Sequence, residues 1–411
     1  LRVRTTLDAR LQTLAREAVE RGLEDLDGRQ GYRGPTGRVT GKALEKKRAE
    51  LRDEHGPDGP KLSAVVEGVV VGVEKDAGDP KKGKILVDVG ATAPGFVDCA
   101  LEPRYAPGSK PLPARFAPGD LVRVRVAPER RAGPPVAGEP LPLALELGPQ
   151  AAMVVLDPHT GDVLALVGGY GYRSGGFDRS QRAHRQPGSS FKPFVYAAAI
   201  DSRRYTAASL VNDAPEVYAL WKPQNYEREE FRGAVRLRVA LAHSINTVAI
   251  RLLSDIGLPA VREIAVRSGV TSPIGDELGL SLALGSLTVT PLELAASYAP
   301  FANGGNRVEP HVLTMVGDEA EPPRTPVPAL RPESAYVVTS LMRSVVDDGT
   351  ARAASARLRR PVAGKTGTSN DQKDAWFVGF SPDLLAAVWV GYDDMRKLGK
   401  GEAGGRTALP I

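Results

Sequence analysis

The chain has 411 residues, more than one hydrophobic core normally supports, so we expect two or three domains. Hydrophobic residues make up 42% and charged residues 25%, which excludes a disordered chain. The formal net charge of +5 permits an anionic partner without requiring one. The single cysteine, Cys99, excludes a disulfide framework within the chain, and the five histidines lack the spacing of metal ligands. We therefore expect neither a metal nor a cofactor.

The longest apolar stretch, around residues 384–390, is far shorter than the roughly 18 residues that a membrane span requires. No signal-peptide pattern opens the chain, which begins at Leu1. We expect a soluble piece of a longer protein.

The first 60 residues combine a short extended run at 3–6 with helical spacing of apolar residues over 7–23. A loop rich in glycine and arginine follows at 28–41, and the charged run 42–54 is typical of a solvated helix or linker. We interpret this region as a linker, with a first strand and helix, that leads into the C-terminal domain.

Residues 61–148 predict short strands separated by glycine and proline turns, at 65–73, 84–89, 95–99, 121–126 and 143–147. Five short strands are typical of a small barrel of the OB kind, which often binds single-stranded nucleic acid through a basic groove and aromatic platforms. Residues 61–148 contain 12 basic and 11 acidic residues, so they have no concentrated positive charge, and they contain only three aromatic residues. We therefore expect no nucleic acid and interpret the barrel as a docking or spacing module.

Residues 149–411 mix strand and helix patterns, which predicts an α/β domain. Strands are expected at 151–156, 163–167, 374–380 and 385–392, and helices at 192–200, 236–255 and 291–302.

Ser189 and Lys192 stand three residues apart at the predicted start of a helix, which places both side chains on one face. Free backbone N–H groups at that helix end can hold an oxyanion, and a desolvated lysine can take the serine proton. By itself the pattern is more typical of a capping serine and a solvent-facing lysine, because it recurs by chance in long proteins.

Two further patterns could serve the same chemistry. Ser244 and Asn246 could relay a proton and hold a substrate amide, although such residues are common in loops and caps. The run 364–368 resembles a phosphate-binding loop, but Arg359 stands where that loop needs its first glycine. We expect instead an edge strand that admits a ligand backbone and offers hydroxyl groups, with Lys365, Thr366, Gly367 and Thr368.

The three patterns occur in the order S-x-x-K, S-x-N and K-T-G-T that penicillin-interacting serine enzymes use. Their flanks extend the match, at Arg185-Gln186-Pro187-Gly188-Ser189, Pro223-Gln224-Asn225-Tyr226, Ala283-Leu284-Gly285-Ser286, Thr290-Pro291-Leu292-Glu293-Leu294, Phe301-Ala302-Asn303-Gly304-Gly305 and Trp376-Phe377-Val378-Gly379-Phe380-Ser381-Pro382. Through these motifs residues 149–411 resemble the transpeptidase domain of class A penicillin-binding proteins. The barrel and the leading Thr5-Thr6-Leu7-Asp8 resemble those of the 1A type.

The resemblance implies the α/β (α+β) penicillin-binding transpeptidase fold, with a central antiparallel sheet covered by helices, beside the small all-β barrel. It implies a D,D-transpeptidase that cross-links peptidoglycan stem peptides through a serine acyl-enzyme at D-Ala-D-Ala. Ser189 would be the nucleophile, and β-lactam antibiotics would acylate it. The implied localisation is the periplasmic face of the cytoplasmic membrane.

The resemblance also implies the roles of the other residues. Lys192 would be the base for acylation, and Ser244 would relay protons between it, Lys365 and the leaving amine. Asn246 would hold the acyl-side amide of the substrate. The edge strand would bind the terminal carboxylate and complete the oxyanion hole, at Thr366, Gly367 and Thr368.

Class A proteins also carry a membrane anchor and a glycosyltransferase domain, and these 411 residues contain neither. Residues 404–411 resemble the motif before the last helix of the family, so we expect that helix to be missing. We expect contact with the membrane only through the missing N-terminal part, and docking of an envelope regulatory protein on the barrel.

Two alternatives stay open. A D,D-carboxypeptidase or β-lactamase-like hydrolase on the same scaffold would need a device that activates water, usually a carboxylate, and the sequence identifies none. A catalytically silent binding or sensing module is disfavoured, because every polar residue that the S-x-x-K, S-x-N and K-T-G-T motifs require is present.

Overall fold

The computed structural model describes residues 2–30, 34–61, 65–79, 82–101, 112–127, 139–146, 148–170, 177–218, 221–226, 230–322, 324–355, 358 and 360–411. The chain forms two compact units, of which the larger comprises residues 1–23, 149–172 and 176–411. The smaller comprises residues 24–148 and 173–175, so residues 24–60 belong with the barrel. The predicted domain limits of 1–60, 61–148 and 149–411 stay a prediction.

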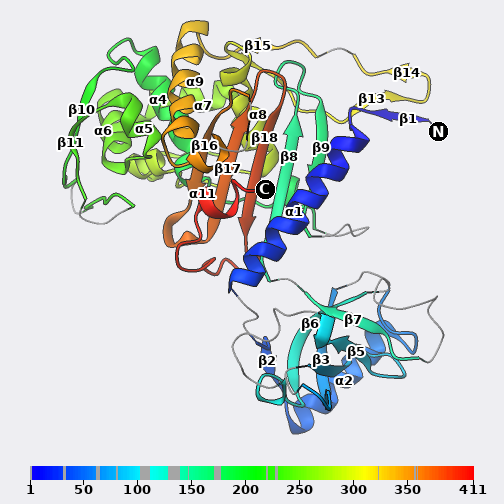
Figure 1. Ribbon diagram of the computed structural model, residues 1–411. Coiled ribbons are helices and arrows are strands. Elements are labelled where there is room, and N and C mark those ends of the chain that lie inside the picture. The colour runs from blue at the N-terminus through cyan, green and yellow to red at the C-terminus, as the bar shows by residue number, and fades with distance from the viewer. Residues whose placement is uncertain are drawn as a thin grey trace. The chain divides into compact units, whose positions relative to one another are not determined.

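A five-stranded antiparallel sheet is the centre of the larger unit (Figure 1). Its order is β16 (Ala363–Thr368), β17 (Asp374–Phe380), β18 (Leu385–Gly391), β8 (Gln150–Leu156) and β9 (Val163–Val167). The predicted strands are confirmed, and the run 364–368 is indeed an edge strand; Arg359 lies outside the described residues. The fold class expected for this domain is confirmed.

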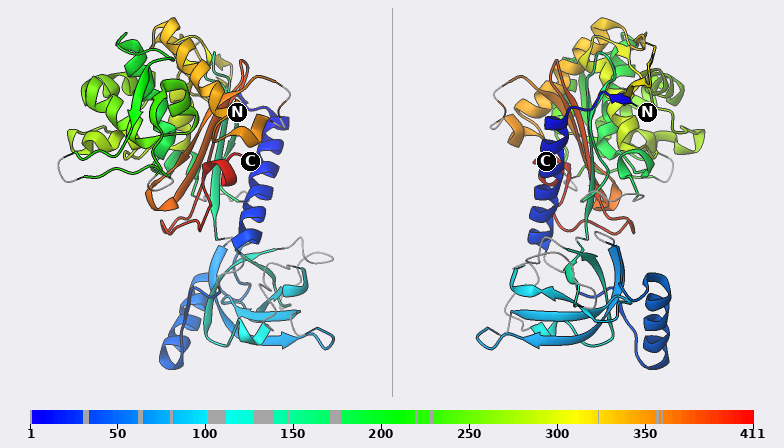
Figure 2. Two further views of the ribbon diagram at one scale, coloured as in Figure 1. Left: turned by 60° about the vertical axis from the view of Figure 1, so that its left-hand side comes forward. Right: turned by 90° about the vertical axis from the view of Figure 1, so that its right-hand side faces the viewer.

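Helices cover one face of this sheet, and residues 9–23 of α1 (Ala9–Gln30) lie on the opposite side (Figure 2). The helices on that side are α4 (Lys192–Asp201), α5 (Leu237–Ala242), α6 (Asn246–Ile256), α7 (Leu258–Ser268), α8 (Pro291–Ala302) and α9 (Pro332–Asp347). Helices α8 and α9 pack directly against the sheet, and α4 packs on α9. Gln12 of α1 forms two hydrogen bonds with the backbone of Leu166, at 2.8 and 3.0 Å. These bonds satisfy part of the open edge of β9.

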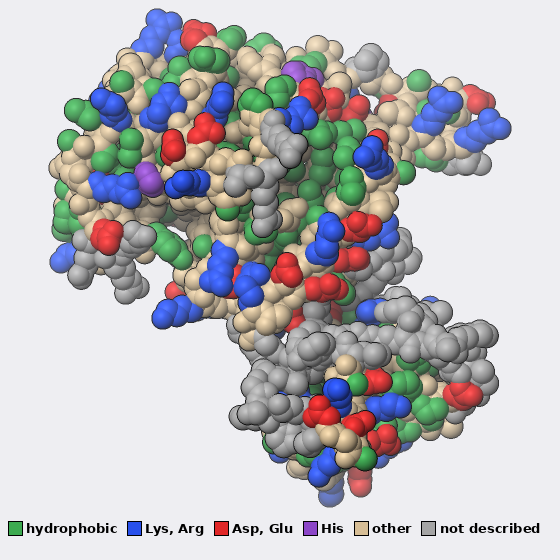
Figure 3. Space-filling model, in the orientation of Figure 1, with side chains coloured by type: hydrophobic (Ala, Val, Ile, Leu, Met, Phe, Trp, Pro, Cys, Tyr) green, Lys and Arg blue, Asp and Glu red, His purple; other side chains and the backbone are tan. Residues whose placement is uncertain are grey.

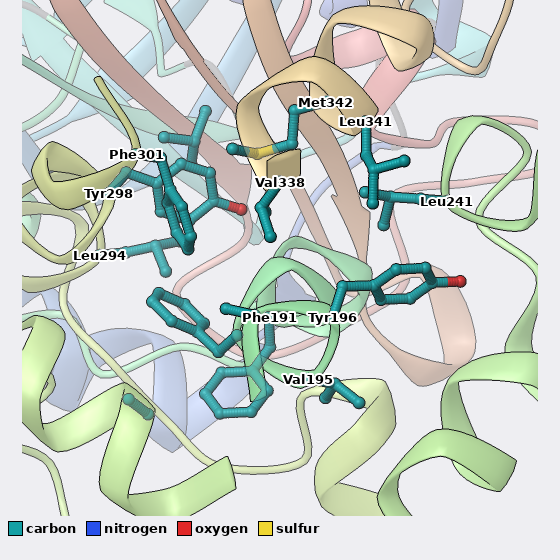
Figure 4. Close-up of a cluster of buried hydrophobic side chains, with 14 of the residues drawn as sticks. Phe191, Val195, Tyr196, Leu241, Leu294, Tyr298, Phe301, Val338, Leu341 and Met342 are labelled. Carbon is teal, nitrogen blue, oxygen red and sulfur yellow. The ribbon is translucent and has the colours of Figure 1, made fainter. Parts of the chain in front are cut away.

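The core between helices and sheet is aromatic and aliphatic (Figure 4). Phe194 contacts Phe191, Tyr298 and Phe301, with ring centroids 5.1 to 5.7 Å apart. Helix α4 is buried along almost its whole length, because it packs against α6, α7 and α9. The residues at its start, which include Lys192, are therefore fixed by the core.

The single helix predicted over 236–255 is wrong in one respect. The structure has two helices, α5 and α6, because Ser244 adopts a left-handed backbone conformation with φ of 58°. A non-glycine residue in this conformation interrupts a helix.

The smaller unit is a closed five-stranded barrel. Strands β3 (Val65–Lys75), β4 (Gly83–Asp88), β5 (Gly95–Asp98), β7 (Pro142–Leu145) and β6 (Asp120–Val126) follow one another, and β6 pairs with β3 to close the ring. The β5–β7 pairing is parallel and the others are antiparallel. Five strands closed in this Greek-key order form an OB-type barrel, as predicted. Cys99 is buried in its core.

The charged run 42–54 forms helix α2 (Gly41–His55), which buries only Leu51 and carries Arg48 in an ion pair with Asp88 of β4. On the face drawn in Figure 3, acidic and basic side chains of the barrel unit are intermixed. Among the described residues, no helix is long and apolar enough to cross a membrane.

Short elements complete the described chain. The remaining strands are β1 (Val3–Thr5), β2 (Gly37–Arg38), β10 (Leu210–Asp213), β11 (Gly233–Arg236), β12 (Asn306–Arg307), β13 (Leu313–Val316), β14 (Glu319–Ala320) and β15 (Val327–Pro328). The remaining helices are α3 (Arg179–Arg182), α10 (Arg352–Ser355), α11 (Gly404–Thr407) and the 3₁₀ turns η1 (Cys99–Leu101), η3 (Leu112–Ala114), η5 (Gly188–Phe191), η6 (Asp276–Leu284) and η7 (Asn370–Gln372).

The start of α8 generates a prediction about stability. Thr290 and Glu293 form a capping box, and the Glu293 carboxylate also accepts the backbone N–H groups of Thr271 and Ser272. Replacing Thr290 by Ala removes one cap and lowers the free energy of unfolding by about 1 kcal/mol. Replacing Glu293 by Ala leaves several donors unpaired and costs more, about 2–3 kcal/mol. Urea unfolding of the two variants measures both values; equal losses would contradict the wider role of Glu293.

Candidate active site

A cavity of about 800 Å³ in the larger unit is lined by five of the residues that the sequence singles out. Its lining includes Ser189 from η5, Ser244 and Asn246 from the break between α5 and α6, and Thr366 and Thr368 from β16. Three segments far apart in the sequence therefore contribute to one site.

Ser189 reaches the edge strand because glycines let the two backbones touch. Gly188 has φ of 56°, and a Cβ there would lie 2.3 Å from the carbonyl oxygen of Thr368. A Cβ on Gly367 would lie 2.3 Å from the carbonyl oxygen of Pro187. Any side chain at either position would push η5 and β16 apart. Both glycines are thus required for Ser189 to lie beside β16.

Lys192 and Lys365 are fully buried and meet at one hydroxyl group. Lys192 Nζ donates to the Ser244 carbonyl oxygen and to Asn246 Oδ1, both at 2.6 Å, and lies 3.3 Å from Ser244 Oγ. Lys365 Nζ donates to Ser244 Oγ and to the carbonyl oxygen of Thr366, both at 2.9 Å. Within the described part of the chain, no carboxylate forms an ion pair with either lysine.

Burial without a counter-charge changes the acidity of both lysines. Desolvation lowers the pKa of Lys192 well below its ordinary value, and the positive charge of Lys365 lowers it further. Burial lowers the pKa of Lys365 to about 7. A neutral Lys192 has two N–H donors for its two 2.6 Å acceptors and keeps a lone pair that can accept a proton. The pair can therefore act as proton acceptor and donor near neutral pH.

Ser244 owes its position to the end of α5. Its N–H donates to the Leu241 carbonyl at 3.0 Å, and the N–H of Ile245 donates to the Ala240 carbonyl at 2.9 Å. These two bonds form a Schellman motif, in which glycine normally occupies the left-handed position that Ser244 holds. The turn aims the carbonyl group of Ser244 at Lys192, and the hydroxyl group contacts both lysines. Backbone strain here coincides with a side chain that contacts both buried lysines.

The hydroxyl groups of β16 are oriented by hydrogen bonds with neighbouring segments. Thr368 Oγ1 accepts the N–H of Gly404 at 3.1 Å, so its own proton can be donated to a ligand. Thr366 Oγ1 lies 2.7 Å from Thr350 Oγ1. A Cβ on Gly404 would lie 2.4 Å from the carbonyl oxygen of Gly367, so this glycine allows the C-terminal segment to cover β16.

Sequence reasoning missed some contributors to the cavity. Thr350 follows α9 in a turn without any spacing signal, and Asp213 ends the short strand β10, which pairs with β11. Asn225 belongs to a flanking motif that the resemblance singled out, but its role was not assigned. Asp374 has a structural environment: it is buried at the start of β17 and accepts the indole N–H of Trp389 at 2.9 Å. Burial raises the pKa of that carboxyl group.

The described residues contain no group of three or more histidine, cysteine, aspartate or glutamate side chains that could hold a metal ion. The cavity is lined by hydroxyl and amide groups and also by charged side chains, among them Asp213, Glu230 and Arg232. The Ser244 hydroxyl on its wall contacts the two buried amines, a combination suited to acyl transfer through a serine nucleophile.

Comparison with known proteins agrees with this geometry. Residues 151–411 match the family described as the penicillin binding protein transpeptidase domain, and the chain belongs to that family. It is 34% identical over 475 residues to penicillin-binding protein 1A of Pseudomonas aeruginosa and 37% identical over 436 residues to that of Neisseria meningitidis. Both alignments cover 100% of this chain, but only 56% and 51% of those proteins. The chain thus spans about half the length of these relatives.

Solved structures show the same relationship. Penicillin-binding protein 1A from Haemophilus influenzae superposes with a TM-score of 0.73 at 26% identity, over 99% of this chain and 64% of that one. The penicillin-binding protein PonA1 from Mycobacterium tuberculosis superposes with a TM-score of 0.56 at 28% identity, over 64% of this chain and 75% of that one. The expected resemblance to class A penicillin-binding proteins of the 1A type is confirmed.

The low pKa of Lys365 predicts a pH-dependent stability. Between pH 7 and about 10 the unfolded chain holds a proton on this lysine that the folded chain has lost, so stability rises with pH. Lys365→Met removes the group and reduces this rise. Thermal unfolding of the parent and the variant at about pH 7 and about pH 9.5 measures the difference. The same rise in both proteins would contradict the assignment.

The conformation of Ser244 predicts an unusual order of stabilities. Ser244→Ala and Ser244→Gly both remove the hydroxyl group, but only glycine relieves the left-handed conformation. We expect the glycine variant to be more stable than the alanine variant by about 1 kcal/mol. Urea unfolding of the two proteins compares them directly, and a more stable alanine variant would show that Ser244 is unstrained.

Proposed function

We propose that this chain is the D,D-transpeptidase part of a class A cell-wall synthase, with Ser189 as nucleophile. The observation that carries the proposal is one cavity lined by both Ser189 and Ser244, in which the Ser244 hydroxyl contacts two buried lysines. Membership of the penicillin-binding transpeptidase family supports it. A structure of the related PonA1 protein contains penicillin V, which supports β-lactams as ligands of this cavity.

In the proposed acylation, Ser189 Oγ attacks the carbonyl carbon between the two terminal D-alanines of a stem peptide. Lys192 accepts the hydroxyl proton, and the C–N bond breaks as D-Ala leaves with a proton relayed through Ser244 from Lys365. The product is an ester between the stem peptide and Ser189. An amine from a neighbouring stem peptide then attacks the ester carbonyl, and its proton returns through Ser244 to Lys365. The ester C–O bond breaks as Lys192 gives its proton back to Ser189 Oγ, which leaves a new peptide bond and the free serine.

Backbone and side-chain groups stabilise the proposed intermediate. The N–H groups of Ser189 and Thr368 form the oxyanion hole, each contributing about 3 kcal/mol in comparable enzymes. The contact of Gly188 with the Thr368 carbonyl supports this pairing. The hydroxyls of Thr366 and Thr368, with the charge of Lys365, hold the terminal carboxylate. Gly367 contributes by letting η5 approach β16, because the Pro187 carbonyl occupies the space beside it that the sequence assigned to the substrate backbone.

Asn246 holds the acyl-side amide of the substrate in this proposal. One proton of its amide group is donated to the Gln224 carbonyl at 2.8 Å, and Oδ1 accepts from Lys192. The second amide proton is available for a substrate carbonyl. Asn246 would therefore link the base to the substrate.

The surroundings of the site are part of the same proposal. We place the site on the periplasmic face of the cytoplasmic membrane, as the resemblance implies, and we assign residues 61–148 to docking of an envelope regulatory protein. The balanced charge of the barrel supports a protein partner rather than nucleic acid.

Intact mass spectrometry after brief incubation with benzylpenicillin tests the proposal. We expect an adduct of one penicillin on the parent chain and none on Ser189→Ala, because the acyl ester forms only at that hydroxyl group. A folded parent without an adduct would contradict the proposal. Rapid β-lactam turnover without a trapped adduct would instead support the alternative of a hydrolase on the same scaffold.

A further inference from the structure

The segment Pro223-Gln224-Asn225-Tyr226 contacts Asn246, although it belongs to none of the S-x-x-K, S-x-N and K-T-G-T motifs. Asn225 Oδ1 accepts the backbone N–H of Asn246 at 3.0 Å and that of Thr247 at 3.4 Å. These are the first two N–H groups of α6, and the residue before them, Ile245, provides no side-chain cap. Asn225 therefore caps α6 from a distant part of the chain.

Asp213, at the end of β10, holds this cap in place. Its side chain is buried and accepts hydrogen bonds from Asn225 Nδ2 at 2.9 Å and from Thr247 Oγ1 at 2.5 Å. A third bond comes from the backbone N–H of Arg232 at 2.9 Å. One carboxylate thus ties together the loop with Asn225, the first turn of α6 and the segment before β11. A buried acceptor with several donors is costly to disturb.

Asn246 lies at the end of this chain of bonds. Its backbone N–H is held by Asn225, and its side-chain amide donates to the carbonyl of Gln224. Two contacts from one loop fix the direction of the amide group, so that Oδ1 points at Lys192 Nζ, 2.6 Å away. The orientation of Asn246 toward Lys192 therefore depends on groups that do not themselves touch Lys192.

We propose that Asp213, Asn225 and Thr247 are positioning residues for acylation, which act by fixing the amide of Asn246 against Lys192. The inference rests on the proposed function of Ser189 and deepens it. It assigns a role to the motif at 223–226, which the proposed nucleophile, base and carboxylate-binding residues do not include. Loss of the network would let the Asn246 amide rotate. It would weaken acylation more than it weakens the fold, since catalytic geometry tolerates only small displacements.

The test uses matched substitutions in the full 411-residue chain. Thr247→Val removes the hydroxyl donor to Asp213 while keeping the shape, and Thr247→Ser restores the donor. Thr339→Val is the control, because the Thr339 hydroxyl donates to the Phe301 carbonyl at 2.5 Å and lies outside the catalytic cavity. Asn225→Leu provides a second disruption if Thr247→Val does not fold.

Two quantities are measured for each folded variant. The first is the rate of acylation by benzylpenicillin, followed by intact mass; the second is the separation of Asn246 Oδ1 from Lys192 Nζ in a crystal structure. We expect Thr247→Val and Asn225→Leu to be acylated at least about tenfold more slowly, with the amide out of hydrogen-bond distance. Thr247→Ser recovers most of the rate, and Thr339→Val keeps it.

Unchanged acylation in both disrupted variants, or an unmoved Asn246 amide, would overturn the inference. So would an equal loss of rate in Thr339→Val, since that would indicate general destabilisation. A folded parent that penicillin does not acylate would refute the proposed function, and the crystal structures would then decide the inference alone. In that case a displaced amide supports the positioning network, and an undisplaced one excludes it.

Discussion

The burial of two lysine amines around one serine hydroxyl is the constraint on which the rest of the site depends. An unpaired ammonium group inside a protein is costly, so it must lose its proton or find strong acceptors. Lys192 and Lys365 do both: burial lowers each pKa, and their donors meet backbone and side-chain oxygens. The main source of those oxygens is the break between α5 and α6, at Ser244 and Asn246. A continuous helix would hide the backbone carbonyl of Ser244 in its own hydrogen bonds.

The second requirement is close approach of backbones. The turn that carries Ser189, the edge strand β16 and the C-terminal segment at Gly404 touch one another through glycines. Ser189 and the threonines of β16 can then line one cavity, although they lie far apart in the sequence. The aromatic core around Phe194 supports this arrangement, because it fixes the helix that begins at Lys192.

Much of the architecture follows from local sequence. Alternation and turn residues predicted the barrel strands and the sheet strands close to their limits, since each has a clear apolar period bounded by glycine or proline. The break at Ser244 was not predicted, because serine has no intrinsic preference for a left-handed conformation and the run around it keeps a helical period. Hydrogen bonds from Lys192 to the Ser244 carbonyl and from Lys365 to the Ser244 hydroxyl satisfy the polar groups that the break exposes.

By itself the sequence determined the class of fold, the family and the set of candidate site residues. Motif order and hydrophobic periodicity can be read directly from the amino-acid sequence, without knowledge of the tertiary structure. Only the tertiary structure decided that both lysines are buried, that one hydroxyl serves them both, and that Asp213 and Asn225 stand behind Asn246. These features are hydrogen bonds and desolvation between segments distant in sequence. Their free energy depends on which groups the folded chain brings together. The spacing of residues along the sequence does not predict which distant groups will meet.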